Sequence, residues 1–438
     1  LVRSRGLGDV YKRQLLMNIR LKPCRFCGEV TAISSKSDAH RLLIASALSD
    51  RPTFIRCNAR SADITATVNC LNSLGADIKF VDGGISVKPI KEKRKSAVLD
   101  CNESGSTIRF LLPVAASLGT NTEFTGSGRL PERPLSPLRE QMEAHGVVFS
   151  PINVFPVKIN GKMISGEFTI KGNISSQFIT GLLFALPLLN GNSIINVIPP
   201  VESRPYIDMT LNTLKKFGIT VTEKSNSFFI PGGQKYASPG TVESEGDWSN
   251  SAFFLTAGAV SGRVTVTGLD VSSVQGDKQI LTILKEMGAE ITVEQGSITV
   301  KKGDLHGINI DARNIPDLVP IISVAAAAAN DGETVITGAE RLKIKESDRL
   351  TAVYESLKTL GVDISKTDDG LVINKTGIVG GGAVSGYNDH RMVMALSVLS
   401  AVSSGDIILR GAEAVNKSYP NFFEDFSSLG GSYNVINS

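Results

Sequence analysis

The sequence has few cysteines, few aromatic residues and no long apolar run, and each shortage argues against a class of protein. Its 438 residues include five cysteines, an odd count that argues against a disulfide framework and for a reducing, cytoplasmic compartment. Its best apolar stretch, residues 319–329, is shorter than the roughly 18 residues of a membrane-spanning helix. Aromatic residues make up 6% and the net charge is +3, which disfavours a nucleic-acid-binding protein.

Signatures of cofactor and metal binding are also missing. The chain has neither the Gly-x-x-x-x-Gly-Lys-Ser/Thr loop of P-loop NTPases nor the Gly-x-Gly-x-x-Gly turn of dinucleotide enzymes. Cys24 and Cys27 have the spacing of half a zinc knuckle, but no second close pair of Cys or His follows them. We therefore expect no metal and no cofactor, so cationic side chains would have to neutralise any charge on the substrate.

Six polar clusters recur along the chain at a nearly constant spacing. Each cluster runs directly into an apolar stretch, which is the pattern of a helix N-terminus. With one marker residue from each cluster, the gaps are 70, 70, 73, 68 and 73 residues. The markers are Lys36, Ser106, Ser176, Ser249, Asp317 and His390. A sixfold repeat of this length predicts one supersecondary unit per repeat.

A glycine closes a second helix in every repeat. These glycines are 71, 72, 70, 73 and 69 residues apart, at Gly75, Gly146, Gly218, Gly288, Gly361 and Gly430. Glycine just past the last apolar helical residue is the usual left-handed cap, and strand-like segments follow it in most repeats. Each unit is therefore expected to run strand, helix, strand, helix, strand, strand, which gives an α/β (α+β) class with mixed sheets.

The first helix of several units is apolar on all sides, as in residues 182–186 and 324–329, and such a helix is buried. We therefore expect an inside-out α/β barrel in each of two domains, with three units per domain, helices inside and sheets outside. The predicted domains are residues 34–242 and residues 17–33 joined with 243–438. Residues 1–16 precede Met17 and are expected to be a non-native leader or scar.

The clustered helix N-termini predict a site for anions. Free N–H groups and the helix dipole favour a bound anion, and Lys36 and Arg41 are cations near the start of the first such helix. Further cations precede the second helix of several units, in the segments 129–134, 203–206, 343–349 and 417–420. Two domains that face each other would enclose a cleft lined by these helix ends.

Two carboxylates lie among the cations. Asp317 follows Pro316 at a helix start, and Glu346 lies between Lys345 and Arg349. Nearby cations hold both carboxylates ionised, yet one of the two has to carry a proton if it is an acid catalyst. We take this pair as the candidate acid–base groups; the plain structural alternative for each is a helix cap or an ion-pair partner.

These motifs resemble the enolpyruvyl transferase family over essentially all of residues 17–438. The likeness is carried by Lys36-Ser37-x-x-x-Arg41, Gly105 with Arg109, Gly128-Arg129 with Glu132-Arg133-Pro134, Ser175-Ser176-Gln177, Ser203-x-Pro205-Tyr206, Pro316-Asp317, Lys345-Glu346-Ser347-Asp348-Arg349, Asn388-Asp389-His390-Arg391-Met392 and Lys417 before Pro420. The branch of the family that acts on shikimate 3-phosphate is the closer match. The resemblance implies that the enolpyruvyl group of phosphoenolpyruvate moves to the 5-hydroxyl of shikimate 3-phosphate by addition and elimination, with release of phosphate. It also implies two domains that close on substrate, a place in aromatic amino acid biosynthesis and a target of glyphosate.

The resemblance further implies a role for each matching residue. Asp317 would accept the proton of the attacking hydroxyl and would also contact the substrate. Glu346, aided by Lys36, would protonate the methylene carbon. Shikimate 3-phosphate would be held by Ser37, Arg41, Ser175, Ser176, Ser203 and Lys345. Phosphoenolpyruvate would be held by Arg129, Arg349, Arg391 and Lys417, with Gly105 admitting its close approach. Lys36 and Gln177 would touch both substrates.

Two positions depart from the commonest pattern of the family. The loop around Gly105 reads Glu103-Ser104-Gly105-Ser106 where Asn-Ala-Gly-Thr is commoner, which bears on the phosphoenolpyruvate side of the site and on sensitivity to glyphosate. Arg341 stands where many members carry Asn, so we assign it no ligand role.

Two other functions compete with this interpretation. The sister enzyme that acts on UDP-N-acetylglucosamine carries Cys in the loop matching residues 126–133 and Asn after the first Lys, whereas this chain has no Cys there and Ser37 follows Lys36. A repeat ring that binds nucleic acid is the non-enzyme alternative, and the aromatic content and charge disfavour it. We expect a monomeric enzyme with two small-molecule substrates and no nucleic-acid or membrane partner.

Overall fold

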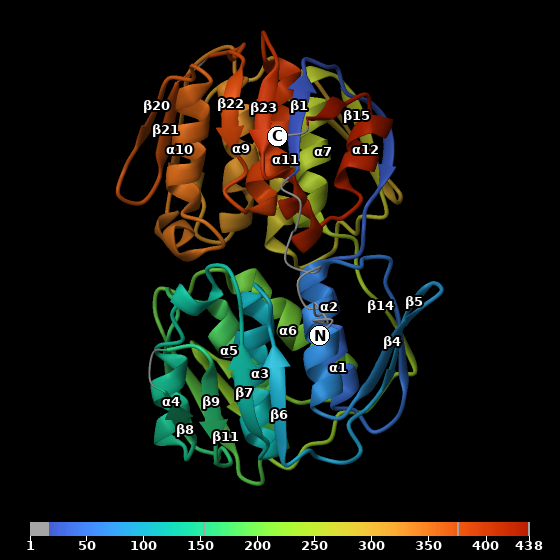
Figure 1. Ribbon diagram of the computed structural model, residues 1–438, viewed down its shortest axis with the longest axis vertical. Coiled ribbons are helices and arrows are strands. Elements are labelled where there is room, and N and C mark those ends of the chain that lie inside the picture. Colours follow the sequence, from blue (N-terminus) through green and yellow to red (C-terminus); the bar gives the residue numbers. More distant parts are fainter. Residues whose placement is uncertain (1–16, 152–153, 375, 437–438) are drawn as a thin grey trace, which may run out of the picture.

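The computed structural model describes residues 17–151, 154–374 and 376–436, so the expected leader at residues 1–16 lies outside them. The described chain forms two lobes stacked along the long axis of the molecule, each with its own apolar core (Figure 1). We call the part built on residues 36–243 the N-terminal lobe, and the part built on residues 17–31 and 248–436 the C-terminal lobe. No helix among the described residues is long and apolar enough to cross a membrane.

The N-terminal lobe is built from α-helices and three four-stranded sheets. Its helices are α1 (Lys36–Ala47), α2 (Ala62–Ser73), α3 (Gly105–Leu118), α4 (Leu138–Ala144), α5 (Ser176–Ala185) and α6 (Arg204–Lys216). Its strands are β3 (Thr53–Arg56), β4 (Asp77–Val81), β5 (Gly84–Lys88), β6 (Ser96–Asp100), β7 (Asn121–Thr125), β8 (Val148–Ser150), β9 (Val157–Asn160), β10 (Glu167–Lys171), β11 (Ser193–Ile198), β12 (Thr222–Lys224), β13 (Ser227–Ile230) and β14 (Thr241–Glu243). The strand orders are β14-β3-β5-β4, β6-β7-β9-β8 and β10-β11-β13-β12.

The C-terminal lobe repeats this plan. Its helices are α7 (Trp248–Ser261), α8 (Ile280–Glu286), α9 (Val319–Ala327), α10 (Arg349–Thr359), α11 (His390–Leu399) and α12 (Phe422–Ser428). Its strands are β1 (Asn18–Lys22), β2 (Cys27–Thr31), β15 (Arg263–Thr267), β16 (Glu290–Glu294), β17 (Ser297–Lys301), β18 (Asn309–Asp311), β19 (Glu333–Thr337), β20 (Ile364–Lys366), β21 (Leu371–Asn374), β22 (Gly382–Ser385), β23 (Ile407–Arg410) and β24 (Ser432–Ile436). The strand orders are β16-β17-β15-β2, β18-β19-β21-β20 and β22-β23-β1-β24.

The second repeat shows the expected unit in full. Its elements follow one another as β6, α3, β7, α4, β8 and β9. In its sheet β6 pairs with β7 in parallel, while β9 pairs with β7 and with β8 in antiparallel fashion. The other five sheets have the same pattern of one parallel and two antiparallel pairs. The predicted mixed α/β class is therefore confirmed.

The first and fourth units exchange their first strands. β2 precedes α1 in the chain but pairs with β15 in the C-terminal lobe, and β14 precedes α7 but pairs with β3 in the N-terminal lobe. The chain consequently passes between the lobes twice, through residues 32–35 and 244–247. These two segments are bonded to each other, because the backbone N–H of Ser35 donates to the carbonyl of Glu245 at 2.7 Å.

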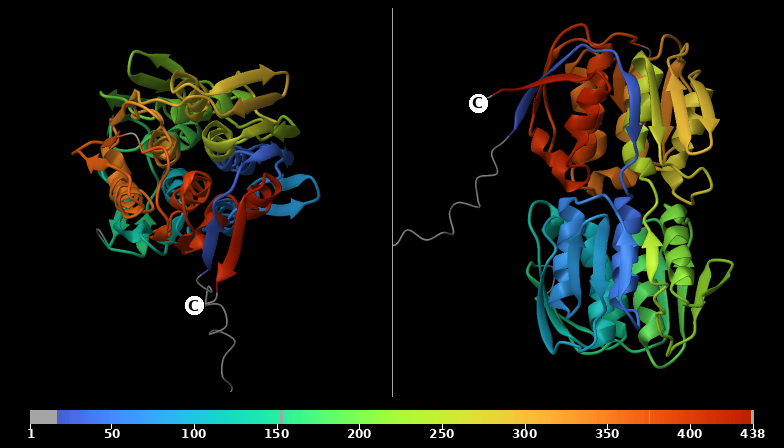
Figure 2. Two further views of the ribbon diagram at one scale, coloured as in Figure 1. Left: turned by 90° about the horizontal axis from the view of Figure 1, so that it is seen from above. Right: turned by 90° about the vertical axis from the view of Figure 1, so that its right-hand side faces the viewer.

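The first helix of each unit lies inside its lobe. All residues of α9 are buried, as are all but two of the 14 residues of α3. Viewed down the long axis, the sheets lie around the helices (Figure 2). Helices that are apolar on every side are stable only where other elements cover them, and the sheets supply that cover. The predicted inside-out arrangement is confirmed.

The helix ends follow the predicted caps. Side chains at five starts of central helices accept a backbone N–H from the first turn: Ser35, Ser104, Ser175, Asp247 and Asp389. Each of the six periodic glycines has a positive φ, between 74° and 113°, as a left-handed C-cap requires. The two periodic signals of the sequence therefore mark the start of the first helix and the end of the second helix of each unit.

Candidate active site

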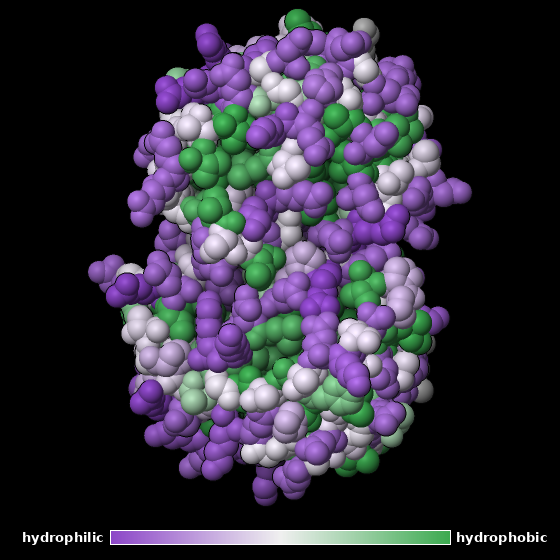
Figure 3. Space-filling view, turned by 180° about the vertical axis from the view of Figure 1, so that it is seen from behind, coloured by the Kyte–Doolittle hydropathy of each residue, from purple (hydrophilic) through white to green (hydrophobic). Residues whose placement is uncertain are grey.

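A polar cavity lies between the lobes, where the N-termini of the central helices meet. The N-terminal lobe contributes the starts of α1, α3, α5 and α6. The C-terminal lobe contributes α10, α11 and two 3-10 turns, Pro316–Leu318 and Glu340–Ile344. Figure 3 shows hydrophilic side chains gathered along the boundary between the lobes. The facing helix starts anticipated from the repeat therefore surround one shared space.

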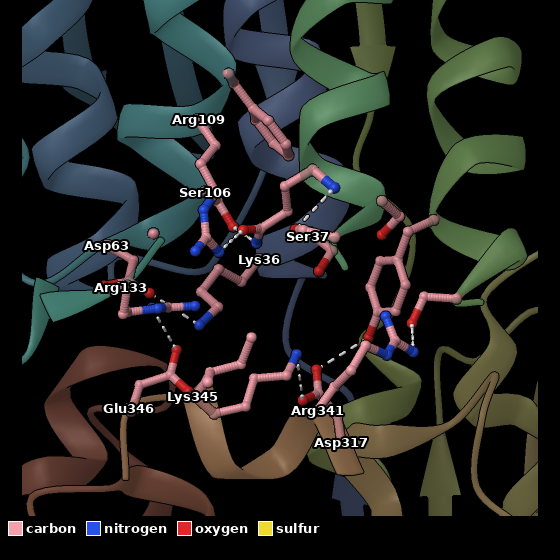
Figure 4. A pocket seen from close by; sticks show the side chains of 18 of the residues that line it. Lys36, Ser37, Asp63, Ser106, Arg109, Arg133, Asp317, Arg341, Lys345 and Glu346 are labelled. Atoms are coloured by element: carbon pink, nitrogen blue, oxygen red, sulfur yellow. Dashed lines mark hydrogen bonds and ion pairs between the residues drawn. The ribbon is translucent and has the colours of Figure 1, made fainter. Parts of the chain in front are cut away.

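Most of the residues named from the sequence line this cavity. They are Lys36, Ser37, Arg41, Gly105, Ser175, Ser176, Gln177, Ser203, Asp317, Lys345, Glu346, Arg349 and Arg391. Figure 4 shows Lys36 and Ser37 on one side and Asp317, Lys345 and Glu346 facing them from the other lobe.

Two of the named residues are not among those that line the cavity. The side chain of Arg129 is 40% exposed and forms an ion pair of 3.3 Å with Glu132. The ammonium group of Lys417 lies 2.8 Å from a carboxylate oxygen of Glu103 and 2.6 Å from the carbonyl of Asn388. Glu103 belongs to the loop in which the sequence departs from the usual family pattern, so this departure places a carboxylate directly on Lys417.

Asp317 is held by cations and by one hydroxyl. Its carboxylate lies 2.7 Å from Nη1 of Arg349 and 3.1 Å from Nη2 of Arg391. The hydroxyl of Tyr206 donates to it from the opposite lobe at 3.0 Å. Burial alone would raise the pKa of the Asp317 carboxyl, but Arg391, Lys345 and Arg349 together hold it well below its usual range. Asp317 is therefore ionised and able to accept a proton.

Glu346 shares one of these cations and takes another from the opposite lobe. Nη2 of Arg349 donates to it at 2.8 Å, and Nη1 of Arg133 approaches its other oxygen at 3.4 Å. Burial alone would raise the pKa of the Glu346 carboxyl, but Arg349 and Arg133 help to lower it well below its usual range. Glu346 is therefore also ionised among these partners, and a proton on it requires a change in this environment.

Lys36 joins the two lobes at the start of α1. Its ammonium group lies 2.9 Å from Asp63, with the lysine side chain 15% exposed. Its backbone N–H donates at 3.0 Å to Asp247, the residue that caps α7 of the C-terminal lobe. The negative partner that the sequence predicted at this helix start is thus supplied in part by Asp247, a carboxylate of the protein itself.

Neutral donors and two more arginines complete the wall of the N-terminal lobe. Gln177 accepts from Arg109 at 2.8 Å and donates to Ser106 at 2.9 Å. Arg41 is almost fully buried and bonds to Thr210 and to the carbonyl of Tyr206, and its burial lowers its pKa to about 10. These contacts hold the side chains of Gln177 and Arg41 in place.

Gly105 lies under the guanidinium of Arg133. A Cβ at this position would stand 2.5 Å from Nη1 of Arg133, well inside van der Waals contact. The Arg133 side chain is 6% exposed. A larger residue at 105 would therefore displace the arginine that reaches Glu346.

Sequence reasoning gave no site role to several residues that line the cavity: Asp63, Arg109, Arg133, Tyr206, Arg341 and His390. Arg109, Arg133, Tyr206 and His390 lie inside the quoted motifs, but nothing in a linear pattern distinguishes the cavity-facing Arg133 from its neighbour Arg129. Asp63 follows the cap of the second helix of its unit, where no periodic marker was recognised. Among the described residues no group of three His, Cys, Asp or Glu side chains is placed to hold a metal ion.

Comparisons with known proteins show the family of the chain. The family model for EPSP synthase (3-phosphoshikimate 1-carboxyvinyltransferase) matches residues 22–426. Proteins named 3-phosphoshikimate 1-carboxyvinyltransferase from Clostridium novyi and Brachyspira hyodysenteriae are 41% and 42% identical over 425 and 419 residues; the alignments cover 94% of this chain in both cases and 98% and 99% of the relatives.

Solved structures extend the likeness to three dimensions. The EPSP synthase of Acinetobacter baumannii has a TM-score of 0.81 at 26% identity, covering 96% of this chain and 100% of that one. The enolpyruvyl transferase NikO from Streptomyces tendae, at 15% identity and a TM-score of 0.77, covers 97% of this chain and 99% of its own and shares the fold. The chain belongs to the EPSP synthase family.

Proposed function

We propose that this chain transfers the enolpyruvyl group of phosphoenolpyruvate to the 5-hydroxyl of shikimate 3-phosphate and releases phosphate. One observation carries the proposal: two half-buried carboxylates, Asp317 and Glu346, are bridged by the single guanidinium of Arg349 and face the hydroxyls and cations of the other lobe across one cavity. Such a site can move protons while holding two multiply anionic substrates.

Asp317 and Glu346 divide the proton transfers. The 5-hydroxyl oxygen attacks C2 of phosphoenolpyruvate, and its proton passes to Asp317. Glu346, aided by Lys36, gives a proton to the methylene carbon C3, which leaves a tetrahedral intermediate. The C2–O bond to phosphate then breaks with its electron pair leaving on phosphate, C3 returns a proton to Glu346, and the enolpyruvyl ether remains. The anionic substrates offset the cations that lower the pKa of Glu346, so Glu346 is able to carry its proton only when the cavity is filled.

Phosphoenolpyruvate is the ligand that the cationic end of the cavity suits. Arg349 and Arg391 lie at Asp317 and offer planar groups that match carboxylate and phosphate oxygens. We also assign phosphoenolpyruvate to Arg129 and Lys417. In the structure each of these two cations is paired with a glutamate that does not line the cavity. We infer that substrate anions replace these glutamates as partners.

Shikimate 3-phosphate fits the side built from hydroxyls. We assign it to Ser37, Arg41, Ser175, Ser176, Ser203 and Lys345. Burial lowers the pKa of Lys345 to about 8, so this lysine is still largely protonated near neutral pH and becomes more so beside a phosphate. Lys36 and Gln177, near both sides, are assigned to both substrates, and Gly105 leaves room for phosphoenolpyruvate.

The two-lobed architecture supplies the exclusion of water. Side chains of both lobes contact across the cavity, including Tyr206 with Asp317 and Arg133 with Glu346. Closure around substrate strengthens every charge interaction inside and protects the intermediate from hydrolysis. We also propose that the lobes are the domains 34–242 and 17–33 with 243–438, and that the enzyme is a cytoplasmic monomer.

The direct test is phosphate release from phosphoenolpyruvate with shikimate 3-phosphate, with no metal added. We expect release with both substrates together and none when either is omitted. Replacement of shikimate 3-phosphate by UDP-N-acetylglucosamine is the matched control, and it should give no release. Release only with UDP-N-acetylglucosamine, or no release with any pair, would overturn the assignment.

A further inference from the structure

Ser203 has an unusual conformation at the start of α6. Its φ is 54°, in the left-handed region that a non-glycine residue seldom adopts, and its side chain makes no capping hydrogen bond to α6. The residue is 3% exposed and lines the cavity. Strained backbone of this kind persists where surrounding contacts hold it, and it gathers at functional sites.

Arg341 of the C-terminal lobe reaches this serine. Its Nη2 donates to the Ser203 hydroxyl at 3.0 Å and to the carbonyl of Arg313 at 2.8 Å. Its Nε forms an ion pair with Glu202, and the arginine and glutamate side chains are only 12% and 16% exposed. Figure 4 shows Arg341 beside Asp317, on the far side of the cavity from Arg133.

The hydrogen-bonding capacity of a hydroxyl shows what this contact does. A serine hydroxyl has one donor and two acceptor positions, and Arg341 occupies an acceptor position. The donor of Ser203 has no acceptor among the hydrogen bonds of the described residues. Because an arginine N–H cannot accept, the serine O–H must point away from Arg341. An anionic oxygen in the cavity is a partner for that proton.

We propose that Arg341 is a positioning residue that turns the Ser203 hydroxyl into a fixed donor for an anionic oxygen of the acceptor substrate. The ion pair with Glu202 keeps the Arg341 side chain in the orientation that this hydrogen bond requires. The inference rests on the proposed function and deepens it, since it assigns a role to a residue to which the sequence comparison gave none. The anionic group in question is the phosphate of the phosphorylated acceptor.

The position of the contact links this task to closure of the lobes. Glu202 and Ser203 precede α6 in the N-terminal lobe, whereas Arg341 comes from the turn Glu340–Ile344 in the C-terminal lobe. The backbone N–H of Ser203 also donates across the boundary, to the carbonyl of Arg313 at 3.1 Å. Separation of the lobes would release all of these bonds together, so the serine is fixed as a donor only in the closed arrangement.

A double-mutant cycle tests the proposal. We would measure the KM for shikimate 3-phosphate at saturating phosphoenolpyruvate for Arg341→Gln, Ser203→Ala and the double variant. Loss of a hydrogen bond to a charged group should raise this KM about 10- to 100-fold in each single variant. The double variant should match Ser203→Ala, because Arg341 acts through Ser203, while the KM for phosphoenolpyruvate and kcat should change by less than about threefold.

Two further variants make the result decisive. Arg313→Gln removes the same charge from a side chain that is 56% exposed and paired with Asp311, so it should leave the KM for shikimate 3-phosphate unchanged. Arg341→Lys keeps the ion pair with Glu202 and should raise the KM less than Arg341→Gln, which also covers the case that the glutamine variant folds poorly. Additive effects in the double variant would show that Arg341 binds the acceptor directly and would overturn the proposal, as would an unchanged KM in Arg341→Gln. An inactive wild-type enzyme would instead overturn the proposed function.

Discussion

The two lobes have the same fold but present different side chains at the same place in the repeat. The central helices of the N-terminal lobe are capped by Ser35, Ser104 and Ser175, whereas Asp247 and Asp389 cap α7 and α11 in the C-terminal lobe and Asp317 lies in the turn before α9. The C-terminal lobe lines the cavity with the carboxylates of Asp317 and Glu346, and the N-terminal lobe lines it mainly with hydroxyls, an amide and cations. Duplication kept the direction of the helices and let the exposed first turn diverge, so that in our proposal one lobe mainly binds the acceptor while the other supplies the proton chemistry.

The acidic lobe needs internal cations if it is to receive anionic substrates. Among the cations that line the cavity, Arg349 has the most carboxylate contacts. Its guanidinium contacts Asp317, Glu346 and Asp389, and its side chain is 1% exposed. Burial alone would lower the pKa of Arg349, but these three carboxylates raise it above its ordinary value. A buried network of this kind is stable only when every member is paired, which ties the geometry of Asp317 to that of Glu346.

The largest effect should come from the acidic lobe. Asp317→Ala removes the proton acceptor and is expected to lower kcat by about 10³- to 10⁴-fold, the upper range for a general acid–base group. Binding of shikimate 3-phosphate, followed by calorimetry, should remain measurable because the hydroxyl side of the cavity is intact. Asp311→Ala is the matched control, since its side chain is 56% exposed, and it should be fully active. A normal kcat in Asp317→Ala would contradict its role.

Glu346→Gln should have the next largest effect, about a 10²- to 10³-fold loss of kcat. We expect less than for Asp317 because Lys36 remains to assist protonation of the methylene carbon. The specific measurement is exchange of the methylene hydrogens of phosphoenolpyruvate with solvent deuterium, which should fall in step with turnover. Glu355→Gln, at an exposed position on α10, should exchange at the normal rate. Exchange that persists in Glu346→Gln while turnover is lost would assign the proton to another group.

The sequence predicted the repeat because helix ends leave a local signature. Caps such as Ser104 and Asp389 and glycines such as Gly75 act within a few residues of themselves, so their pattern survives in a linear reading. The buried central helices were predicted for the same reason, since an apolar run such as α9 needs no partner to be recognised. The clustering of helix starts at one cavity then followed from the repeat.

Contacts between distant segments left no such signature. The predicted bounds placed residues 27–31 with the C-terminal domain and residues 241–242 with the N-terminal domain, but the sequence did not show that β2 pairs with β15 and β14 with β3, each more than 180 residues away. Arg129 and Arg133 stand four residues apart and look equivalent in sequence, yet only Arg133 of the two lines the cavity. The role of Arg341 depends on Glu202 and Ser203 of the other lobe, which no spacing rule connects to it.

A third variant tests whether the lobes act on each other electrostatically. Arg133→Gln removes the cation that the N-terminal lobe places 3.4 Å from Glu346. Because Arg133 helps to lower the pKa of Glu346, its loss should raise that pKa. The protonated form of Glu346 is the active one, so activity falls as the pH rises through this pKa. The falling limb of kcat, which reports the substrate-filled enzyme, should therefore move to higher pH, by about half a unit to one unit.

The control for this shift is Arg129→Gln. Arg129 is paired with Glu132 and not with Glu346, so its replacement should not move the falling limb of the pH profile. Because we assign Arg129 to phosphoenolpyruvate, its replacement should change the KM for that substrate. An unmoved limb in Arg133→Gln, measured from about pH 5 to 9, would mean that the two lobes do not set the protonation of the acid. The two lobes would then still differ in role, one in binding and the other in proton transfer, but a charge in one lobe would not alter a pKa in the other.

The smallest effects should come from single hydroxyls of the N-terminal lobe, and two adjacent serines separate binding from stability. Ser175 caps α5 by accepting the backbone N–H of Gln177 at 3.3 Å, whereas Ser176 is the first residue of the helix and is not its cap. Ser175→Ala should therefore lower the free energy of unfolding by about 1 kcal/mol through loss of the cap, and also raise the KM for shikimate 3-phosphate. Ser176→Ala should raise that KM by about three- to tenfold with an unchanged melting temperature. If both variants lose the same stability and neither changes KM, these hydroxyls serve only to hold the helix, and the N-terminal lobe would bind the acceptor through its cations alone.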